Sequence, residues 1–131
     1  MTLTACVDNK LGLQFNGRRQ SQDRTLRERL LSMVDTRLLM GPYSGKMFAF
    51  NEKIVVSADY LAAAGADDWV FAEDTAYLSY ARKIDRIILF RWNRDYPGDV
   101  CFAFPGQWQL TCREEFPGSS HEKITMEIYQ K

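Results

Sequence analysis

Ionisable side chains crowd the stretch from residue 18 to residue 29, where one carboxylate is surrounded by arginines. The carboxylate is Asp23, at the start of a segment with helical spacing. Its position suits a cap for the helix, whose first amides lack partners, and a second interpretation follows from the resemblance described below. The arginines indicate either a solvated helix face, interspersed with Glu28, or an anion-binding surface. They are Arg18, Arg19, Arg24, Arg27 and Arg29.

Other residues with metal-binding or nucleophilic chemistry are few and scattered. His121, the only histidine, stands in a polar segment between Ser120 and Glu122, which favours a solvated loop over a catalytic base. The three cysteines form no CxxC pair, so neither a disulfide framework nor a metal site is expected. We expect them to be small buried hydrophobic side chains in a reducing compartment. They are Cys6, Cys101 and Cys112.

Length and charge limit the classes of function. The 131 residues suit one domain over residues 1–131, and a 46% hydrophobic composition is enough for a core. The 17 basic and 17 acidic side chains cancel. This balance disfavours a nucleic-acid partner, because neutralising phosphates normally requires a basic excess. No segment has the pattern of a signal peptide or a membrane span, so we expect a cytoplasmic protein with no membrane contact.

The elements that must position these residues are short strands alternating with helices. Helices are expected from Asp23 to Val34, from Asp74 to Ile84 and, briefly, at Tyr60–Ala64, where Gly65 ends the turn. Their order among the strands predicts an α/β fold with a single, mostly parallel central sheet, antiparallel C-terminal strands and two main flanking helices. The expected strands are Leu3–Val7, Arg37–Met40, Lys53–Ser57, Trp69–Ala72, Arg86–Trp92, Val100–Phe102, Trp108–Arg113 and Thr125–Tyr129.

Several segments, taken in order, form a recognisable series. The opening TACVDNKLGLQFNG is a strand followed by a glycine-containing loop, Asp23 opens the first helix, and Met40-Gly41 ends the next expected strand. Ile84–Leu89, Gly98-Asp99 and the closing segment His121–Lys131 follow. In this order the segments resemble dihydrofolate reductases, with the second loop glycine of that family replaced by Gln14. The resemblance covers nearly the whole chain.

The resemblance implies a dihydrofolate reductase-like fold and a reaction in which NADPH gives a hydride to a pterin ring. Asp23 would then grip the pterin edge and assist its protonation, with Arg27 and Ala5 as further substrate contacts. No metal is implied. The positions implied for cofactor binding are Gly12, Leu13, Gly41, Ser44, Ser57 and Tyr77.

The sequence departs from the family pattern on both sides of this site. Arg27 stands where the family stacks an aromatic ring on the substrate, and it could pair with Asp23 at i,i+4 spacing. Phe90 replaces a threonine hydroxyl, and Pro42 replaces a phosphate-binding arginine. The family's pair of glycines is replaced within Ala72–Asp74, which brings two carboxylates to an expected helix start where phosphates would lie. The interval from Ala58 to Asp68 has also lost a strand and a helix.

Two hypotheses follow. One is a diverged member of the fold with a degraded NADPH site, acting as a protein that binds a small molecule, such as a folate-like or pterin-like ligand, or a partner. The other is an NADPH-dependent oxidoreductase that reduces dihydrofolate or a related pterin. Fold alone cannot separate them, because function depends on the site.

Overall fold

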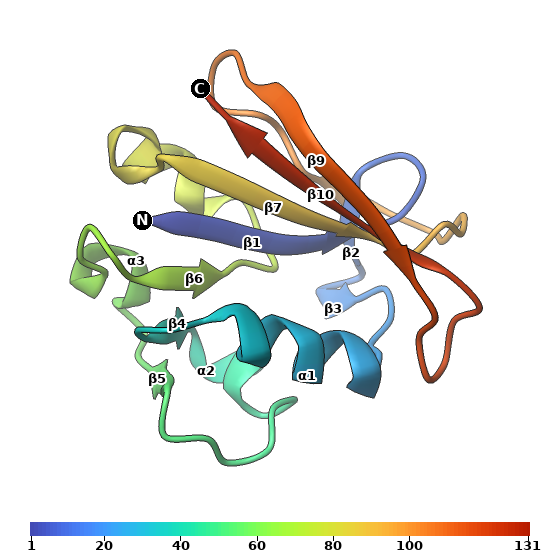
Figure 1. Ribbon diagram of the computed structural model, residues 1–131, viewed down its shortest axis with the longest axis horizontal. Helices are drawn as coiled ribbons and strands as arrows, with labels where there is room; N and C mark the ends of the chain where they lie inside the picture. Colours follow the sequence, from blue (N-terminus) through green and yellow to red (C-terminus); the bar gives the residue numbers. More distant parts are fainter.

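A seven-stranded sheet runs through the molecule, which the computed structural model describes over all 131 residues (Figure 1). Its order is β5-β4-β6-β1-β7-β10-β9. The neighbours from β5 to β7 are parallel, whereas β10 is antiparallel to both β7 and β9, as the element order predicted. The strands are β1 Thr2–Val7, β4 Leu38–Met40, β5 Ile54–Val56, β6 Trp69–Phe71, β7 Arg86–Arg91, β9 Gln109–Phe116 and β10 Ile124–Gln130.

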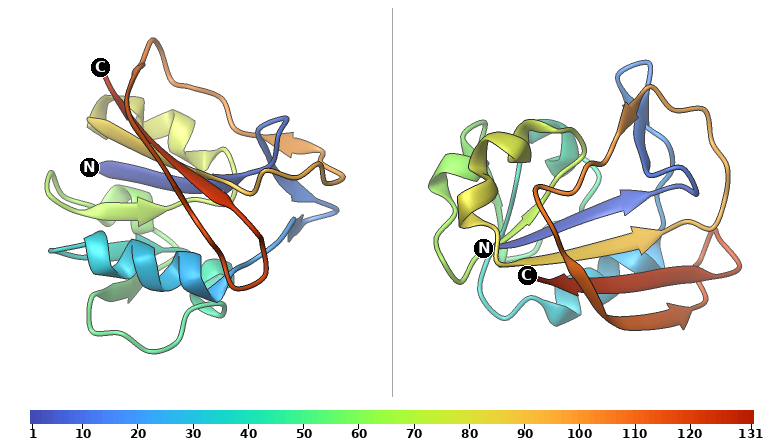
Figure 2. Two further views of the ribbon diagram at one scale, coloured as in Figure 1. Left: turned by 45° about the vertical axis from the view of Figure 1, so that its right-hand side comes forward. Right: turned by 90° about the horizontal axis from the view of Figure 1, so that it is seen from above.

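Helices cover both faces of this sheet. On one face lies α1, Arg24–Met33, whose buried Leu26 and Leu30 are one helical turn apart. On the other lie α3, Tyr60–Ala63, and the 3₁₀ helix η1, Ala76–Lys83. Figure 2, seen from above, shows these two layers on opposite sides of the strands. The α/β class with antiparallel C-terminal strands is therefore confirmed.

The central strand β1 divides the core into two clusters. Because successive side chains of a strand point to opposite faces, Leu3, Ala5 and Val7 enter the cluster below η1. Cys6, between Ala5 and Val7, packs against the cluster below α1. This alternation places Cys6 on the same face as Asp23, which caps α1.

A second, three-stranded sheet was not predicted. It has the order β3-β2-β8 and consists of β2 Gly12–Phe15, β3 Arg18–Arg19 and β8 Val100–Cys101. The expectation that Val100–Phe102 would join the main sheet was wrong, because β8 pairs with β2 instead. The hairpin of β2 and β3 brings Arg19 toward the carboxyl ends of β1 and β6, where the site residues gather.

The helices differ from expectation in two places. The second main helix is a 3₁₀ helix, interrupted at Tyr80 by a non-helical backbone. The hydroxyl of Tyr77, within this helix, forms hydrogen bonds with the backbone of Ala103. A four-residue helix, α2 over Pro42–Gly45, follows β4 and was not expected. The short helix predicted near residue 60 is present as α3.

The shortened interval between β5 and β6 contains only α3 as a regular element, and β5 is an edge strand of the sheet.

Two cysteines also differ from the prediction. Cys101 and Cys112 are exposed, since they lie on the outer strands β8 and β9, while Cys6 is half-buried. None of the helices has the length and apolar character needed to cross a membrane.

Candidate functional site

Asp23 occupies the N-cap of α1, as one of the two sequence interpretations predicted. Its backbone is extended, and its Oδ1 accepts a hydrogen bond from the amide of Leu26, 3.1 Å away. This bond satisfies one of the free amides that begin every helix. Yet Asp23 is more than a surface cap, because its side chain is entirely shielded from solvent.

The loop between β9 and β10 supplies the other partners of Asp23. Oδ1 accepts from the amide and the hydroxyl of Ser119, at 3.1 and 3.2 Å. Oδ2 accepts from the amide of Ser120 at 2.7 Å and faces Nδ1 of His121 at 3.0 Å. Burial opposes ionisation of Asp23, but the bonds from Ser120, His121, Ser119 and Leu26 outweigh it and hold its pKa well below the ordinary value.

His121 lies inside the protein, which corrects the prediction of a solvated loop residue. Only 5% of it is exposed, and its ring stacks on Trp92 with 4.5 Å between centroids. Its Nε2 lies 3.0 Å from Oγ of Ser21 and 3.1 Å from the hydroxyl of Tyr96. The neighbouring Ser119 and Ser120 do face solvent, so the loop is polar outside and buries only its histidine.

Close approach of the loop to Asp23 depends on Gly118. A Cβ atom at this position would lie 2.5 Å from Oδ2 of Asp23 and 2.8 Å from Cδ1 of Ile124. The amide of Gly118 also donates to the carbonyl of His121, which closes a tight turn. Only glycine leaves room for the carboxylate at this point of the loop.

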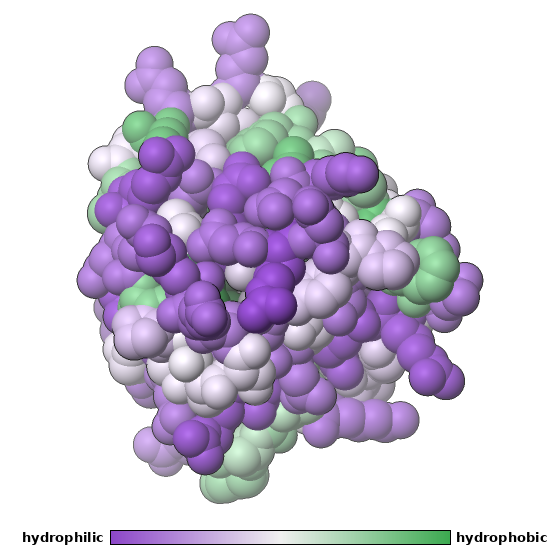
Figure 3. Space-filling view, turned by 90° about the vertical axis from the view of Figure 1, so that its right-hand side faces the viewer, coloured by the Kyte–Doolittle hydropathy of each residue, from purple (hydrophilic) through white to green (hydrophobic).

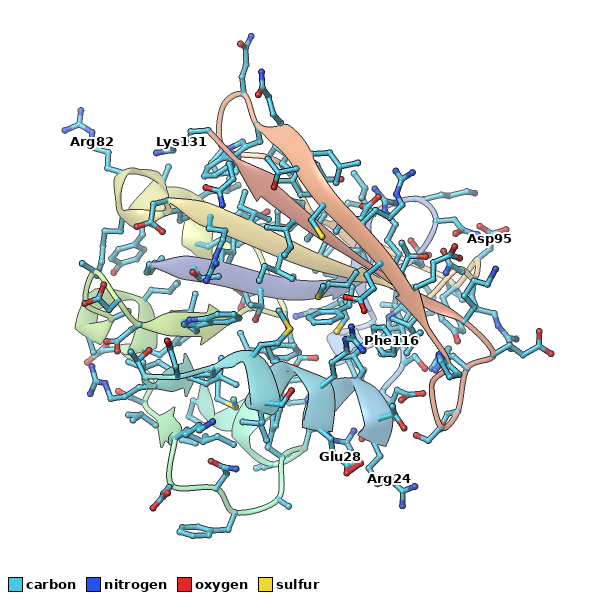
Figure 4. The ribbon with its side chains drawn as sticks, viewed as in Figure 1. Arg24, Glu28, Arg82, Asp95, Phe116 and Lys131 are labelled. Atoms are coloured by element: carbon cyan, nitrogen blue, oxygen red, sulfur yellow. The ribbon has the colours of Figure 1, made fainter.

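The arginines around Asp23 are mostly engaged with other side chains. Arg27 donates to Gln22, and the i,i+4 pair with Asp23 that its spacing allowed is not formed. Arg24 faces Glu28 across 3.7 Å on the outer surface of α1, where Figure 4 shows both side chains in solvent. Arg29 pairs with Glu114 and lies over the ring of Phe116, which Figure 4 also labels.

Arg19 closes the side of the site where phosphates were expected. Its guanidinium binds both carboxylate oxygens of Glu73, at 2.8 and 2.9 Å, and lies 4.2 Å from the centroid of the Tyr43 ring. The hydroxyl of Ser44 donates to the same carboxylate at 2.7 Å. Glu73 is thus neutralised within the protein instead of meeting helix amides, whereas Asp74 does cap the amide of Ala76.

The remaining positions suggested by the resemblance are held by contacts within the chain. Tyr77 is fully buried, and its hydroxyl exchanges hydrogen bonds with the backbone of Ala103. Ser57 accepts from the amide of Asp59. Gly12 donates to Asp8, and a Cβ atom at this position would require the end of the Gln20 side chain to move. Ala5 and Leu13 belong to the core, whereas Gly41 precedes α2 and is half-buried.

Little free volume remains between these residues. Two adjacent cavities of about 10 Å³ each lie there, each with room for about one water molecule. Both are lined by Cys6, Ser21, Phe71, Glu73 and Trp92.

Burial raises the pKa of the Cys6 thiol well above its ordinary value, which makes it a poor nucleophile. Figure 3 shows the corresponding face of the molecule as mostly hydrophilic with small apolar patches.

Sequence reasoning missed the group formed by the buried Trp92 and His121 and the half-buried Ser21 and Tyr96. Trp92 and Tyr96 stand four residues apart, but they are followed by Pro97 and Gly98, so the spacing was no helical signal. His121 is 98 residues from Asp23 along the chain, and no local pattern joins the two. Only the pairing of β10 with β7 brings these segments together.

The whole chain was compared with known proteins. Neither the protein-family models nor the curated proteins give a match. Among solved structures, the chain is similar to dihydrofolate reductase from Enterococcus faecalis complexed with NADP(H) and RAB-propyl. The TM-score is 0.65 with 11% identity, over 99% of this chain and 95% of that one. At this identity the similarity establishes the fold alone.

Proposed function

Because this chain has the dihydrofolate reductase-like fold, we propose that it is a diverged member that does not reduce dihydrofolate efficiently. It acts instead as a protein that binds a small molecule or a partner. The observation that carries this proposal is that the carboxylate of Asp23 is already fully hydrogen-bonded within the chain. Its two oxygens already accept bonds from four residues of the chain: Leu26, Ser119, Ser120 and His121.

A pterin would have to compete for this carboxylate. An ionised carboxylate offers about four lone-pair sites, and five donors from the chain already point at Asp23. A ligand that donates two hydrogen bonds would have to displace the loop containing Ser119 and Ser120. Each hydrogen bond to the charged carboxylate that is lost in this way costs about 1.5–3 kcal/mol. This cost opposes pterin binding before any contact with the ring is considered.

The residues present also do not fit NADPH. Ser44, the hydroxyl expected near the phosphates, donates to Glu73, and Arg19 is bound to the same carboxylate. The cofactor would place its phosphates beside this negative charge and that of Asp74. Pro42, exposed at the start of α2, offers no positive charge. We therefore derive no hydride-transfer step for this chain.

The alternative, an oxidoreductase acting on dihydrofolate or a related pterin, requires Asp23 to be released from its loop and Glu73 to be released from Arg19. The structural similarity to an NADP(H) complex keeps this alternative open to a direct test. A small-molecule ligand remains compatible with the proposal, provided that it does not depend on the carboxylate of Asp23.

Separate titrations with NADPH and folate test the proposal. Trp92 is buried and lines both small cavities, so a ligand bound there would change the tryptophan fluorescence of the protein. We expect no saturable quenching by either molecule at concentrations that saturate an ordinary dihydrofolate reductase measured in the same buffer. Tight binding of NADPH or folate, together with consumption of dihydrofolate, would overturn the proposal and restore the reductase hypothesis.

A further inference from the structure

We propose that Ser21, His121 and Asp23 form a nucleophile, a base and an orienting carboxylate that hydrolyse short acyl esters. The three side chains come from separate segments: Ser21 precedes α1, Asp23 caps it, and His121 lies in the loop between β9 and β10. Oγ of Ser21 is 3.0 Å from Nε2 of His121, and Nδ1 of His121 is 3.0 Å from Oδ2 of Asp23. These distances are those of a serine activated by a neighbouring base.

The hydrogen bonds determine which nitrogen can act as the base. Because Asp23 stays ionised, it can only accept, so Nδ1 of His121 carries the ring hydrogen and donates it to Asp23. Nε2 then has its lone pair directed toward Ser21. Trp92 stacks on the imidazole and Asp23 fixes its edge, so the ring has one orientation. Asp23 is a positioning residue in this scheme.

A second hydroxyl shares the same lone pair. The hydroxyl of Tyr96 lies 3.1 Å from Nε2, nearly as close as Oγ of Ser21. A neutral imidazole nitrogen has a single lone pair, so only one hydroxyl at a time donates well to it. Removing the Tyr96 hydroxyl should therefore leave Nε2 to Ser21 and raise its reactivity.

The space beside Ser21 indicates the class of substrate. Ser21 is half-buried and lines both small cavities. Apolar side chains, including Leu26, Met47 and Phe71, line the cavity toward α1, and Arg27 is its only cationic residue. The cavity holds only about one water molecule, so the acyl group must be as small as acetyl and must approach Ser21 from its solvent-facing side. A cation at the cavity wall suits the negative charge that develops on the carbonyl oxygen.

The reaction balances without a cofactor. Oγ of Ser21 forms a bond to the carbonyl carbon while its proton passes to Nε2 of His121. The bond from that carbon to the alkoxy oxygen then breaks, and the leaving oxygen takes the proton from Nε2, which releases an alcohol. A water molecule next attacks the acyl-serine and gives its proton to Nε2. The proton returns to Oγ as the acyl bond breaks, which releases a carboxylic acid and restores Ser21.

This inference rests on the proposed function in one respect. Asp23 cannot orient His121 and grip a pterin at the same time, so a protein that binds folate through Asp23 would lack the arrangement described here. The two ideas nevertheless fail separately. Folate titration tests whether the carboxylate of Asp23 is available to a ligand, whereas covalent labelling tests the reactivity of Ser21.

The experiment uses a fluorophosphonate, which phosphonylates activated serines, and p-nitrophenyl acetate as the ester. Intact-mass measurement and peptide mapping should find one adduct, on Ser21. Ser21→Ala should abolish both the adduct and the ester hydrolysis. Ser32→Ala is the matched control, because Ser32 is a serine of α1 that bonds only to the carbonyl of Arg29, and it should label like the unmodified protein. Tyr96→Phe should label several times faster.

Circular dichroism of each variant establishes that it is folded. The inference is overturned if the unmodified protein stays unlabelled under conditions that fully label a known serine hydrolase. It is also overturned if Ser21→Ala labels and hydrolyses the ester like the unmodified protein. An unlabelled protein that also fails to bind folate refutes this inference and leaves the proposed function standing. Folate binding that is lost in Asp23→Asn refutes the proposed function directly.

Discussion

Arg19 and Glu73 form a two-pronged ion pair that joins the β2–β3 hairpin to the segment after β6. The side chains are only 18% and 11% exposed, so the pair is partly shielded from solvent. The bond from Ser44 to Glu73 and the contact of Arg19 with Tyr43 extend it to α2. Because Arg19 and Glu73 neutralise each other, Arg19 is not free to bind a diphosphate at this position.

Removing Glu73 should therefore create an anion site. In Glu73→Ala, Arg19 and the hydroxyl of Ser44 lose their common acceptor and become free to bind a phosphate. We expect NADPH affinity to rise, most clearly at low salt, where charges are least screened. Titration at low and at physiological salt measures the effect. Asp74→Asn is the control, because Asn can keep the bond to the amide of Ala76; an equal gain there would contradict the argument.

Asp23→Asn should destabilise the protein much more than loss of a helix cap would. Asn is as good an N-cap as Asp, so a residue that only capped α1 would tolerate the change. Here the neutral amide gives up an ionic acceptor that faces Ser120 and His121 inside the protein. We expect the free energy of unfolding to fall by about 3 kcal/mol, the upper end of the range for a hydrogen bond to a charged group. Urea unfolding measures it, and a loss below that of Asp74→Asn would refute the account.

Gly118→Ala should disturb the same loop without altering any ionisable group. The new Cβ would lie 2.5 Å from Oδ2 of Asp23, so the carboxylate or the turn must move. Forcing extra volume into a packed position costs about 1–3 kcal/mol. Thermal unfolding should show the loss. Gly41→Ala is the matched control, since its Cβ would meet only Tyr60 at an ordinary 3.7 Å, and a similar loss in both variants would count against the proposed contact.

Acid should unfold the protein as its internal carboxylates become protonated. The bond from Arg37 lowers the pKa of Asp68, and the pKa values of Asp23 and Glu127 are also lowered, despite burial. Groups with a lowered native pKa stabilise the fold fully above their ordinary pKa and lose that contribution as the pH falls. Stability should therefore be constant near neutrality and decline below about pH 4. Urea unfolding at a series of pH values should show a shallower decline in Asp23→Asn than in the unmodified protein.

The sequence allowed the main sheet and α1 to be predicted because their signals are local. β-Branched runs mark strands such as β5, and Leu26 and Leu30 are one turn apart in α1. The small sheet was missed because β3 has two residues, both arginine, which carry no strand signal. The burial of His121 was missed because it depends on partners such as Trp92 and Asp23, which are distant along the chain. Polar neighbours made His121 resemble a surface residue.

The hydrogen bonds at the start of α1 can form only after the last of their partners has been synthesised. Asp23 is made early, but its partners Ser119, Ser120 and His121 are made almost a hundred residues later. Until the ribosome has passed His121, the carboxylate has only the amide of Leu26 as a partner and must keep its remaining hydrogen bonds with water. The start of α1 can therefore become buried only after the β9–β10 hairpin has closed, so its packing belongs to a late, non-local stage of folding.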